Sequence, residues 1–496
     1  MPNNLNILFA ASEVVPFAKT GGLADVAGAL PVALEELGHK VKVVMPYYQM
    51  VKKSRKSIKD TEKSVLIEIN DRIVEGKIYQ SKIGKNVTVY LIENEAYYNR
   101  QELYRTTEGD YPDNAERYIF FSKAVLEVAK IFKFQPDIVH CNDWQTGLVP
   151  VLLKVKEQKN PFFENTASVF TIHNLAYQGL FWHLDMPLTN LPWSIFNQEG
   201  IEYYGNINLM KAGIVFSDVV NTVSKKYSKE IQTEEFGCGL EGVLQNRQND
   251  LYGIVNGVDY SQWNPESDKL IKSNFSSSDL NGKKVCREDL LQEFGLKNKP
   301  SAPIIGIISR LADQKGFDLL AEQINAILQF DLFLVLLGTG EEKYHVLFKE
   351  IAKKYSKKVG IKLTFDNTVA HKIEAGSDIF LMPSQYEPCG LNQMYSLKYG
   401  TIPVVRATGG LDDTITNYNP KTGKGNGFKF KPYTGKALLS KIEEAVTVYK
   451  SKKDWKKLLV NAFECDFSWN ASAREYSKLY LKALEKKSNQ PLLVMV

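Results

Sequence analysis

The order of hydrophobic and polar positions along the chain predicts alternating strands and helices. Residues 5–11 form an apolar run of strand length, and the apolar positions of residues 23–34 then recur at helical spacing. A second apolar run occupies residues 41–46. A strand, a helix and a second strand in this order are typical of a βαβ unit and therefore predict a parallel sheet.

The same alternation continues through the first half of the chain. Further strands are expected at residues 137–141, 168–172, 219–222 and 252–255, with helical patterns between them. Residues 1–260 are therefore expected to form one doubly wound, Rossmann-like domain.

A second domain is expected after a polar segment. Residues 261–300 include a serine-rich stretch without periodic apolar positions, which is typical of a linker. Five apolar runs follow, each ending in a loop that contains glycine, serine or charged residues, so residues 301–465 are expected to form a second Rossmann-like domain. The periodicity of residues 466–496 by itself predicts a helix on the protein surface.

Composition narrows the class of protein. Of 496 residues, 62 are Lys or Arg and 57 are Asp or Glu, and the resulting net charge of +5 is too small to indicate a nucleic-acid or membrane-surface protein. The five cysteines form no Cys-x-x-Cys pair and the six histidines show no ligand spacing, so neither a disulfide framework nor a metal site is expected. No basic residue precedes Lys19, and no apolar stretch approaches the length of a membrane span, which favours a cytoplasmic protein.

The unusual polar residues follow the expected strands. In open parallel sheets, ligands bind beyond the carboxyl ends of the strands, and two such edges facing one another would form a polar, basic cleft between the two domains. Lys19 precedes two glycines on a turn from strand to helix, where backbone N–H groups and a cation can bind a phosphate. The other residues in such positions are Asp25, Asp143, His173 and Asn256 in the first domain, and Arg310, Lys315, Glu387, Thr408, Gly409 and Gly410 in the second.

Each of these residues also has a purely structural explanation. His173 alone fits a hydrogen-bonded core histidine, Arg310 and Lys315 fit surface charges, and Glu387 fits a turn before proline. Their common position after the strands of both domains favours a binding site over a set of unrelated structural roles.

Two other enzyme classes fit the pattern less well. Gly338 and Gly340 follow a strand, as in a dinucleotide-binding dehydrogenase, but Lys343 stands where the third glycine of that fingerprint belongs. A metal-dependent sugar transferase would need a ligand spacing such as Asp-x-Asp, which the chain lacks.

Several longer motifs resemble those of bacterial glycogen synthases and plastid starch synthases, in register from Ile7 to about Leu484. They read KTGGLADVAGALP, GDYPDNAERYIFFSKAVLE, VHCNDWQTGLVP, TIHNLAYQG, VNGVD, SRLADQKG, PSQYEPCGLNQMYSLKYGTIPVVRATGGLDDT and DFSW. The resemblance implies a GT-B fold, which is α/β with two doubly wound Rossmann-like domains facing across a cleft. It also implies that residues 466–496 form a helix that crosses back to the first domain.

The resemblance implies an activity as well. Members of this family are retaining, metal-independent hexosyltransferases that transfer glucose from ADP-glucose to the non-reducing end of an α-1,4-glucan, either glycogen or a malto-oligosaccharide. It implies no cofactor, no nucleic acid and no membrane partner. Because the nucleotide leaves as a dianionic diphosphate in an oxocarbenium-like step, the protein itself must supply the positive charge.

By the same resemblance, cations and glycine turns bind the diphosphate. Arg310 and Lys315 are expected to neutralise its charge, and Lys19 is expected to reach it from the first domain. The two glycine turns that offer backbone N–H groups are Gly21-Gly22, close to Asp25, and Thr408-Gly409-Gly410.

The remaining site residues are expected to hold the sugars and the base. Glu387 is expected to bind the hydroxyls of the transferred glucose, His173 to place its 6-hydroxyl or anomeric carbon, and Asp143 to lie near the acceptor. Phe365 stands where family members stack an aromatic ring on the adenine. Further substrate contacts are expected from Cys389, Gly390, Leu391 and Asn256.

Alternatives in mechanism and function stay open at this point. Many retaining relatives have a second glutamate eight positions after the first, but Tyr395 stands there, so this part of the pattern does not carry over. A covalent glucosyl intermediate fits as well as a same-face mechanism in which the diphosphate takes the acceptor proton. The other functions are an α-glucan phosphorylase, another GT-B nucleotide-sugar transferase and a non-catalytic glucan-binding homologue.

Overall fold

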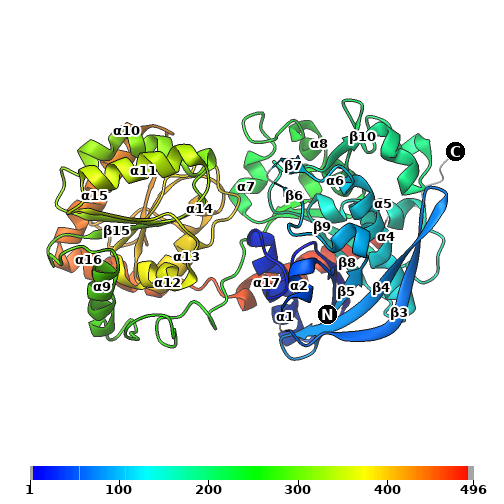
Figure 1. Cartoon of the computed structure of the whole chain (residues 1–496), viewed down its shortest axis with the longest axis horizontal. Helices are drawn as coiled ribbons and strands as arrows, with labels where there is room; N and C mark the ends of the chain where they lie inside the picture. Colours follow the sequence, from blue (N-terminus) through cyan, green and yellow to red (C-terminus); the bar gives the residue numbers. More distant parts are fainter. Residues whose placement is uncertain (1–3, 55, 107, 490–496) are drawn as a thin grey trace. The chain divides into compact units, whose positions relative to one another are not determined.

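The structure is a computed structural model that describes residues 4–54, 56–106 and 108–489. The chain folds into two compact units, each built around a mainly parallel sheet (Figure 1). The first unit runs to Val223 and adds Ser228–Gly257 and the C-terminal segment from Trp469. The second unit consists of Ser224–Tyr227 and Val258–Ser468.

A nine-stranded sheet forms the centre of the first unit, in the order β14-β13-β9-β8-β1-β2-β5-β4-β3. Neighbouring strands from β14 to β5 pair in parallel, whereas β4 is antiparallel to both β5 and β3. These strands are β1 (Asn6–Ala10), β2 (Lys40–Pro46), β3 (Lys59–Ile69), β4 (Arg72–Ile83), β5 (Val87–Glu93), β8 (Ile138–Asn142), β9 (Ala167–Ile172), β13 (Val219–Thr222) and β14 (Leu251–Gly253).

Helices cover this sheet because their apolar faces bury against it; the predicted apolar positions of the first helix, from Leu23 to Leu34, are all buried. The helices are α1 (Gly22–Glu36), α2 (Gln49–Lys52), α3 (Glu95–Tyr98), α4 (Asn114–Ile131), α5 (Leu148–Val155), α6 (Leu209–Phe216), α7 (Lys225–Glu230), α8 (Glu241–Asn246) and α17 (Trp469–Ser488). Short 3₁₀ turns are η1 (Trp144–Thr146), η2 (His183–Thr189), η3 (Trp193–Ile195) and η4 (Gln248–Asp250). Two small antiparallel sheets contain β6 (Arg105–Thr106) with β7 (Gly109–Asp110), and β10 (Leu180–Trp182), β12 (Asn206–Asn208) and β11 (Glu202–Tyr203).

The C-terminal helix α17 packs in the first unit, against α1 and β9. The hydroxyl of Tyr480 lies 2.8 Å from His140 Nδ1, and Asn221 Nδ2 donates to the hydroxyl of Tyr476 at 3.3 Å. Both tyrosines are fully buried. The helix is therefore a core element of the first unit, whereas its periodicity alone predicts a surface helix.

The second unit has a six-stranded, fully parallel sheet in the order β17-β16-β15-β18-β19-β20. Figure 1 shows α10 and α11 over one face of this sheet and α9, α12 and α13 over the other. The strands are β15 (Ile304–Ile308), β16 (Phe333–Leu337), β17 (Val359–Lys362), β18 (Ile379–Met382), β19 (Ile402–Arg406) and β20 (Phe428–Phe430). The helices are α9 (Asn281–Glu293), η5 (Asp313–Lys315), α10 (Phe317–Ile327), α11 (Glu342–Lys354), α12 (Asn367–Gly376), α13 (Asn392–Lys398), α14 (Gly409–Thr414), α15 (Gly435–Lys450) and α16 (Lys452–Phe463).

Residues 261–300, expected to form a linker, instead belong to the second unit. Helix α9 packs on α12, and its Leu290 and Leu291 join the core beneath the sheet. The ammonium of Lys283 is buried against the carbonyls of Ala375 and Tyr399, at 3.0 and 2.9 Å. The sequence did not indicate this because α9 contributes few apolar residues, and packing on α12 holds it in place.

The antiparallel pair β3–β4 also goes beyond the parallel pattern expected from the sequence. Along β3 the buried and exposed residues alternate toward its end, which is the signature of a strand with one solvent-facing side. Among the described residues, no helix is both long enough and apolar enough to cross a membrane.

Candidate active site

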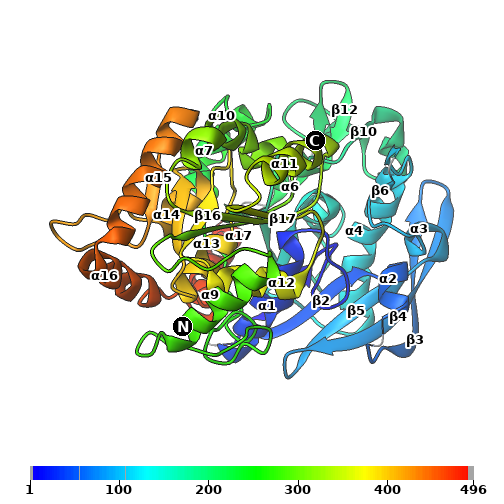
Figure 2. The same ribbon diagram turned by 60° about the vertical axis from the view of Figure 1, so that its left-hand side comes forward.

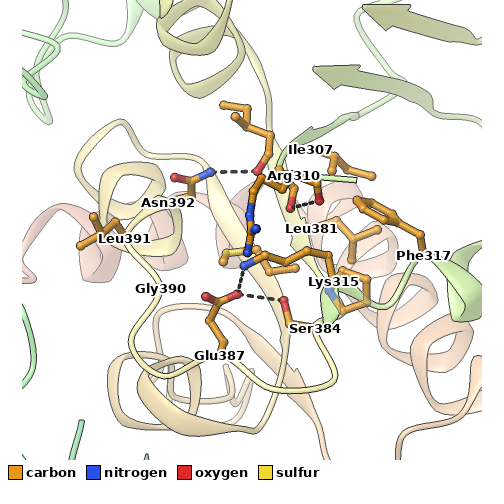
Figure 3. A pocket seen from close by; sticks show the side chains of 14 residues that line it. Ile307, Arg310, Lys315, Phe317, Leu381, Ser384, Glu387, Gly390, Leu391 and Asn392 are labelled. Carbon is orange, nitrogen blue, oxygen red and sulfur yellow. Dashed lines mark hydrogen bonds and ion pairs between the residues drawn. The ribbon is translucent and has the colours of Figure 1, made fainter. Parts of the chain in front are cut away.

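The second unit contains a cavity of about 180 Å³ at the carboxyl ends of β15 and β18 (Figure 3). These strands are neighbours in the sheet although they lie far apart in the sequence. Arg310 and Lys315 come from the loop after β15, and Glu387 comes from the loop after β18. The order of the strands thus brings together the three charged residues that the sequence indicated in this unit.

Lys315 and Glu387 form an ion pair in the wall of the cavity. Lys315 Nζ donates to Glu387 Oε2 at 2.6 Å, and the hydroxyl of Ser384 donates to the same oxygen at 3.1 Å. The side chains are only 17% and 10% exposed. Two donors on one oxygen fix the position of the Glu387 carboxylate, and desolvation strengthens its attraction to the ammonium.

Gly316 allows the Lys315 loop to lie directly against the Glu387 loop. It has φ +73°, and a Cβ atom at this position would lie 2.1 Å from the carbonyl oxygen of Pro383. The backbone N–H of Gln385 donates to the carbonyl of Gln314 at 2.8 Å across the same contact. A residue with a side chain at position 316 would therefore separate the loops that hold the ion pair.

Arg310 adds a second cation to the cavity. Arg310 is exposed to solvent. Figure 3 shows its side chain extending alongside those of Lys315 and Glu387. Next to it, Asn392 Nδ2 donates to the carbonyl of Ile308 at 3.0 Å and ties the start of α13 to the end of β15. Two cations beside one carboxylate leave this cavity with an excess of positive charge, which suits an anionic ligand.

The Thr408-Gly409-Gly410 turn packs against the Glu387 loop. A Cβ atom at Gly409, whose φ is +44°, would lie 1.9 Å from the carbonyl oxygen of Glu387, and one at Gly410 would lie 2.0 Å from that of Cys389. The N–H of Gly410 donates to the carbonyls of Glu387 and Pro388 at 3.2 and 3.1 Å. This N–H is therefore occupied, and the glycines permit close contact between the two loops. The phosphate cradle expected at this turn stays a prediction.

The segment after Glu387 divides between the core and the cavity. Cys389 is 5% exposed and is not among the residues that line the cavity, whereas Gly390 and Leu391 lie in its wall. Gly390 has φ +71°, and Gln393 Nε2 donates to the carbonyls of Cys389 and Gly390 at 3.1 and 3.0 Å. These bonds place Gly390 and Leu391 for contact with a ligand, and the contact expected from Cys389 stays a prediction.

Phe365 lies in the loop between β17 and α12. Its side chain is 84% exposed, and the next residue, Asp366, caps α12 by accepting from Val369 N at 2.9 Å. An exposed aromatic ring held beside a fixed helix start can stack on a planar ligand.

In the first unit, Lys19 stands beside an open turn. Its Nζ donates to Asp25 Oδ1 at 2.7 Å, and its side chain is 52% exposed. A Cβ atom at Gly21 or at Gly22 would meet no atom of the protein within 4 Å. Packing within the protein therefore does not require these glycines, and the space above them is available to a ligand.

Glu13, which the sequence analysis did not single out, organises this turn. Its carboxylate accepts hydrogen bonds from Thr20 N, from Thr20 Oγ1 at 2.6 Å and from Gly21 N at 3.2 Å. The hydroxyl of Tyr104 donates to it at 2.7 Å. The signal was available, because Glu13 also follows the first strand of the parallel sheet.

Asp143 and His173 meet at the carboxyl ends of β8 and β9. Asp143 Oδ1 accepts from the backbone N–H of His173 at 2.7 Å, and His173 Nε2 lies 2.9 Å from Asn142 Oδ1. Asn142 Nδ2 itself donates to the carbonyl of Ala10, so Asn142 Oδ1 is the acceptor and His173 Nε2 carries the proton.

Burial sets the protonation of both groups. Burial lowers the pKa of His173 to about 3, so its imidazole is neutral at physiological pH. Burial raises the pKa of Asp143 to about 7, although the N–H groups of His173 and Asn174 oppose this rise; Glu13 adds to it. Asp143 therefore changes its charge near neutral pH, which is common for residues of functional sites.

Asn256 follows β14 and is 5% exposed. Its side-chain oxygen is buried and accepts no hydrogen bond within the part of the chain that the structure describes. An unsatisfied buried acceptor is costly, and a donor on a ligand would remove that cost.

An aromatic stack in the second unit joins Trp263 to helices α12 and α13. The ring of Trp263 stacks on that of His371 at 3.8 Å and on that of Tyr395 at 4.1 Å. His371 Nδ1 and the hydroxyl of Tyr399 contact the same oxygen of Asp268, at 2.7 and 2.6 Å. Tyr395, which stands where many retaining relatives have a second glutamate, is therefore a packing residue in contact with Trp263.

The described residues contain no group of three or more His, Cys, Asp or Glu side chains placed to hold a metal ion. The arrangement of the second-unit site instead offers two cations, one fixed carboxylate and a cavity wide enough for part of a sugar nucleotide.

Comparison with known proteins identifies the family. Residues 6–246 match the starch synthase catalytic domain, and residues 290–458 match glycosyl transferases group 1. The chain is 47% identical over 488 residues to the glycogen synthase of Koribacter versatilis, covering 98% of this chain and all of that one. It is 48% identical over 489 residues to the glycogen synthase of Pseudothermotoga lettingae, covering 97% of this chain and all of that one.

A solved structure agrees with this similarity over the whole chain. The catalytic domain of starch synthase IV from Arabidopsis thaliana, bound to ADP and acarbose, superposes with a TM-score of 0.89 and 31% identity. It covers 97% of this chain and all of its own. The expected GT-B fold class, family and enzyme class are thereby confirmed, and the chain belongs to the glycogen synthase and starch synthase family of glucosyltransferases that act in glycogen synthesis.

Proposed function

We propose that this chain transfers glucose from ADP-glucose to the non-reducing end of an α-1,4-glucan, with retention of configuration at C1. The observation that carries the proposal is the second-unit cavity, in which Arg310 and Lys315 flank the fixed carboxylate of Glu387. The Arabidopsis starch synthase IV structure contains ADP, which supports an adenine nucleotide as the donor.

The charges of the cavity match the course of glucosyl transfer. The bond from C1 to the diphosphate breaks, the 4-hydroxyl oxygen of the acceptor bonds to C1, and its proton passes to the departing diphosphate. Negative charge grows on the diphosphate during this step, so Arg310 and Lys315 stabilise the transition state more than the bound donor. The products are ADP and a glucan that is longer by one glucose.

Glu387 holds the transferred glucose in this proposal. Its carboxylate is fixed by Lys315 and Ser384, so it can accept hydrogen bonds from sugar hydroxyls without rearranging. Gly390 and Leu391 complete the contact from the cavity wall. Lys315 thus has two roles in this proposal. It orients the carboxylate of Glu387, and it adds positive charge that stabilises the diphosphate of the donor.

The first unit takes the acceptor. The neutral His173 donates from Nε2 to Asn142, which fixes its ring to place the 6-hydroxyl or anomeric carbon of the transferred glucose. Asp143 offers a carboxylate to the hydroxyls of the acceptor glucan. Lys19 contacts the donor diphosphate above the open Gly21-Gly22 turn, since this turn leaves room for a ligand. Asn256 contributes its unsatisfied oxygen to a sugar hydroxyl.

The preference for ADP-glucose over UDP-glucose rests on more than Phe365. A base–aromatic stack is worth about 1–3 kcal/mol whichever base is present, so the ring alone discriminates weakly. The shape and backbone of its loop supply the remaining preference, and slow transfer from UDP-glucose is expected.

The test is transfer of labelled glucose to a malto-oligosaccharide from ADP-glucose and UDP-glucose in parallel. We expect ADP-glucose to be the better donor, and Phe365→Ala to raise the donor KM. Equal or better use of UDP-glucose would overturn the donor assignment, and an unchanged donor KM in the variant would remove Phe365 from the site. A phosphorylase would instead release glucose 1-phosphate from glycogen and inorganic phosphate, which the same samples can be assayed for.

The proposed compartment is the cytoplasm. No two of the five cysteines form a disulfide among the described residues, as is usual for proteins of a reducing compartment. Fractionation of the source cells with an antibody to the chain would test this, and enrichment outside the cytoplasmic fraction would contradict it.

A further inference from the structure

The indole of Trp263 lies between two helices of the second unit. The main part of this unit begins at Val258, and the backbone N–H of Trp263 donates to the carbonyl of Asp259 at 3.0 Å. The indole contacts the ring of His371 in α12 and the ring of Tyr395 in α13. Helices α12 and α13 are neighbours on one face of the sheet (Figure 2).

The two partner rings lie on opposite faces of the indole. The ring centroid of His371 is 3.8 Å from that of Trp263, with an angle of 10° between the planes, and the centroid of Tyr395 is 4.1 Å away, with an angle of 4°. Two rings parallel to the indole at these distances would overlap if they shared one of its faces. Trp263 is therefore sandwiched between α12 and α13.

The α12 side of this stack is rigidly held. His371 Nδ1 and the hydroxyl of Tyr399 contact the same oxygen of Asp268. Burial raises the pKa of Asp268, but the hydrogen bonds from His371 and Tyr399 outweigh burial and hold this pKa below its ordinary value. Asp268 is therefore a carboxylate that only accepts, and both neighbours donate to it. All three side chains are buried, so His371 offers the indole a fixed surface.

The α13 side of the stack is tied to the wall of the cavity. The backbone N–H of Tyr395 donates to the carbonyl of Leu391 at 3.0 Å, and Leu391 lines the cavity together with Gly390 and Asn392. Helix α13 spans only seven residues, so contacts with its surroundings must hold it in place. A shift of Tyr395 would therefore move the first turn of α13 and the cavity wall with it.

Loss of the indole would produce such a shift. Without it, the rings of His371 and Tyr395 would be separated by about two stacking distances, which leaves an empty gap between the helices. Protein structures relax partly into a gap of this kind. Because Asp268 holds His371, we expect α13 to be the side that moves.

We propose that Trp263 is a positioning residue of the donor site. By holding Tyr395, it keeps Gly390 and Leu391 in place for contact with the transferred glucose. This inference rests on the proposed function, because that function assigns the glucose to this part of the cavity. Trp263 is not among the residues that line the cavity, so it acts through α13.

The test compares the kinetics of variants of the full chain, at a temperature well below the melting transition of each. Trp263→Ala is expected to lower kcat/KM for ADP-glucose at least about tenfold, because a displaced contact with the glucose weakens binding of the transition state. The KM for a malto-oligosaccharide should stay close to the wild-type value, since the acceptor residues belong to the first unit. Trp263→Phe keeps a ring for both neighbours and should restore most of the activity.

Trp455→Ala is the matched control for a general loss of stability. Trp455 is also a partly buried tryptophan of the second unit, its ring centroid lies 4.9 Å from that of Tyr449, and neither residue lines the cavity. Its loss should lower the melting temperature and leave kcat/KM for ADP-glucose unchanged. An equal fall of kcat/KM in Trp455→Ala and Trp263→Ala would trace the effect to general loosening and overturn the inference.

A second variant keeps the inference testable even if Trp263→Ala does not fold. Tyr395→Leu removes the stacked ring from α13 and leaves the indole on His371, so it should lower kcat/KM for ADP-glucose to a similar extent. Where both single variants fold, combining them should cost no more than Trp263→Ala alone, because both break the same contact.

The outcomes separate this inference from the proposed function. Transfer by the wild-type chain, with kcat/KM for ADP-glucose unchanged in Tyr395→Leu or with losses that add in the double variant, would overturn only the positioning role. No transfer from ADP-glucose by the wild-type chain would refute the proposed function itself.

Discussion

Replacing Asp143 with asparagine is expected to stabilise the first unit in a strongly pH-dependent way. The pKa of this carboxyl rises from its ordinary value of 3.8 to about 7, mainly because burial penalises the charged form. Between these two pH values the folded state keeps the proton that the unfolded state has lost. The free energy of unfolding of the wild type therefore falls as the pH rises from about 4 to 7, and the full cost is present above pH 7.

The magnitude follows from the size of the shift. About three pH units at about 1.4 kcal/mol each give a cost of about 4 kcal/mol at pH 8, and about 1 kcal/mol at pH 4.5. The asparagine side chain would carry no charge, and its oxygen can still accept the hydrogen bond from the N–H of His173 that Asp143 Oδ1 accepts now. Its Nδ2 cannot accept the bond from the N–H of Asn174, so Asp143→Asn should remove most of the cost rather than all of it.

Scanning calorimetry of the full chain at pH 4.5 and pH 8 measures this difference. We expect the transition of the first unit to rise by on the order of 8 °C at pH 8 and by only a few degrees at pH 4.5. Asp143→Ala serves as the control, because it removes the charge and also the hydrogen-bond acceptor, so its gain should be smaller at both pH values. An equal rise at both pH values, or a fall at pH 8, would refute the reasoning.

Three further predictions concern the second unit and the glycine turns. Glu387→Ala should lower kcat at least about a hundredfold in the transfer assay while the melting temperature changes little, since a positioned transition-state contact is worth about 3 kcal/mol or more; near wild-type turnover would remove Glu387 from the site. Gly409→Ala should lower the free energy of unfolding by about 3 kcal/mol or more in urea titrations, because its Cβ would clash with a carbonyl oxygen at a φ of +44°. Gly21→Ala, its matched control in open space, should keep wild-type stability and raise only the KM for ADP-glucose. Trp263→Ala should cost about 3 kcal/mol in the same titrations by unstacking two rings, and an unchanged midpoint would contradict this role.

The alternation of apolar runs and helical patterns was sufficient to predict most of the two sheets. Strands β8, β9 and β13 in the first unit and β15 to β19 in the second lie where the pattern placed them, within a few residues. This works because parallel strands are buried on both faces and therefore appear as continuous apolar runs, whatever their neighbours are. The pattern predicts strands and helices less well in two cases. One is a strand with an exposed face, as in β3, and the other is an element that contributes few apolar residues to the core, as in α9.

The candidate site was also partly visible in the sequence. Glu387, Arg310 and Lys315 stand after apolar runs, and the carboxyl ends of parallel strands share one edge, so their proximity could be expected. The hydrogen bonds and ion pairs that these residues form could not be predicted from the sequence. The ion pair between Lys315 and Glu387 depends on β15 and β18 being neighbours and on the close approach that Gly316 permits.

Tertiary structure alone decided the roles of several other residues. The sequence does not show that Gly409 and Gly410 lie directly against the carbonyls of Glu387 and Cys389, which leave no room for a Cβ atom. The position of Glu13 after the first strand marks it as a candidate, but only the structure shows that its carboxylate accepts from the N–H groups of Thr20 and Gly21. Sequence periodicity indicates which side of a strand or helix is buried, because apolar residues occupy the buried positions of each element whatever lies beyond it in the fold. Which polar groups meet depends on sheet order and loop packing between segments far apart in the chain, and only the folded structure contains that information.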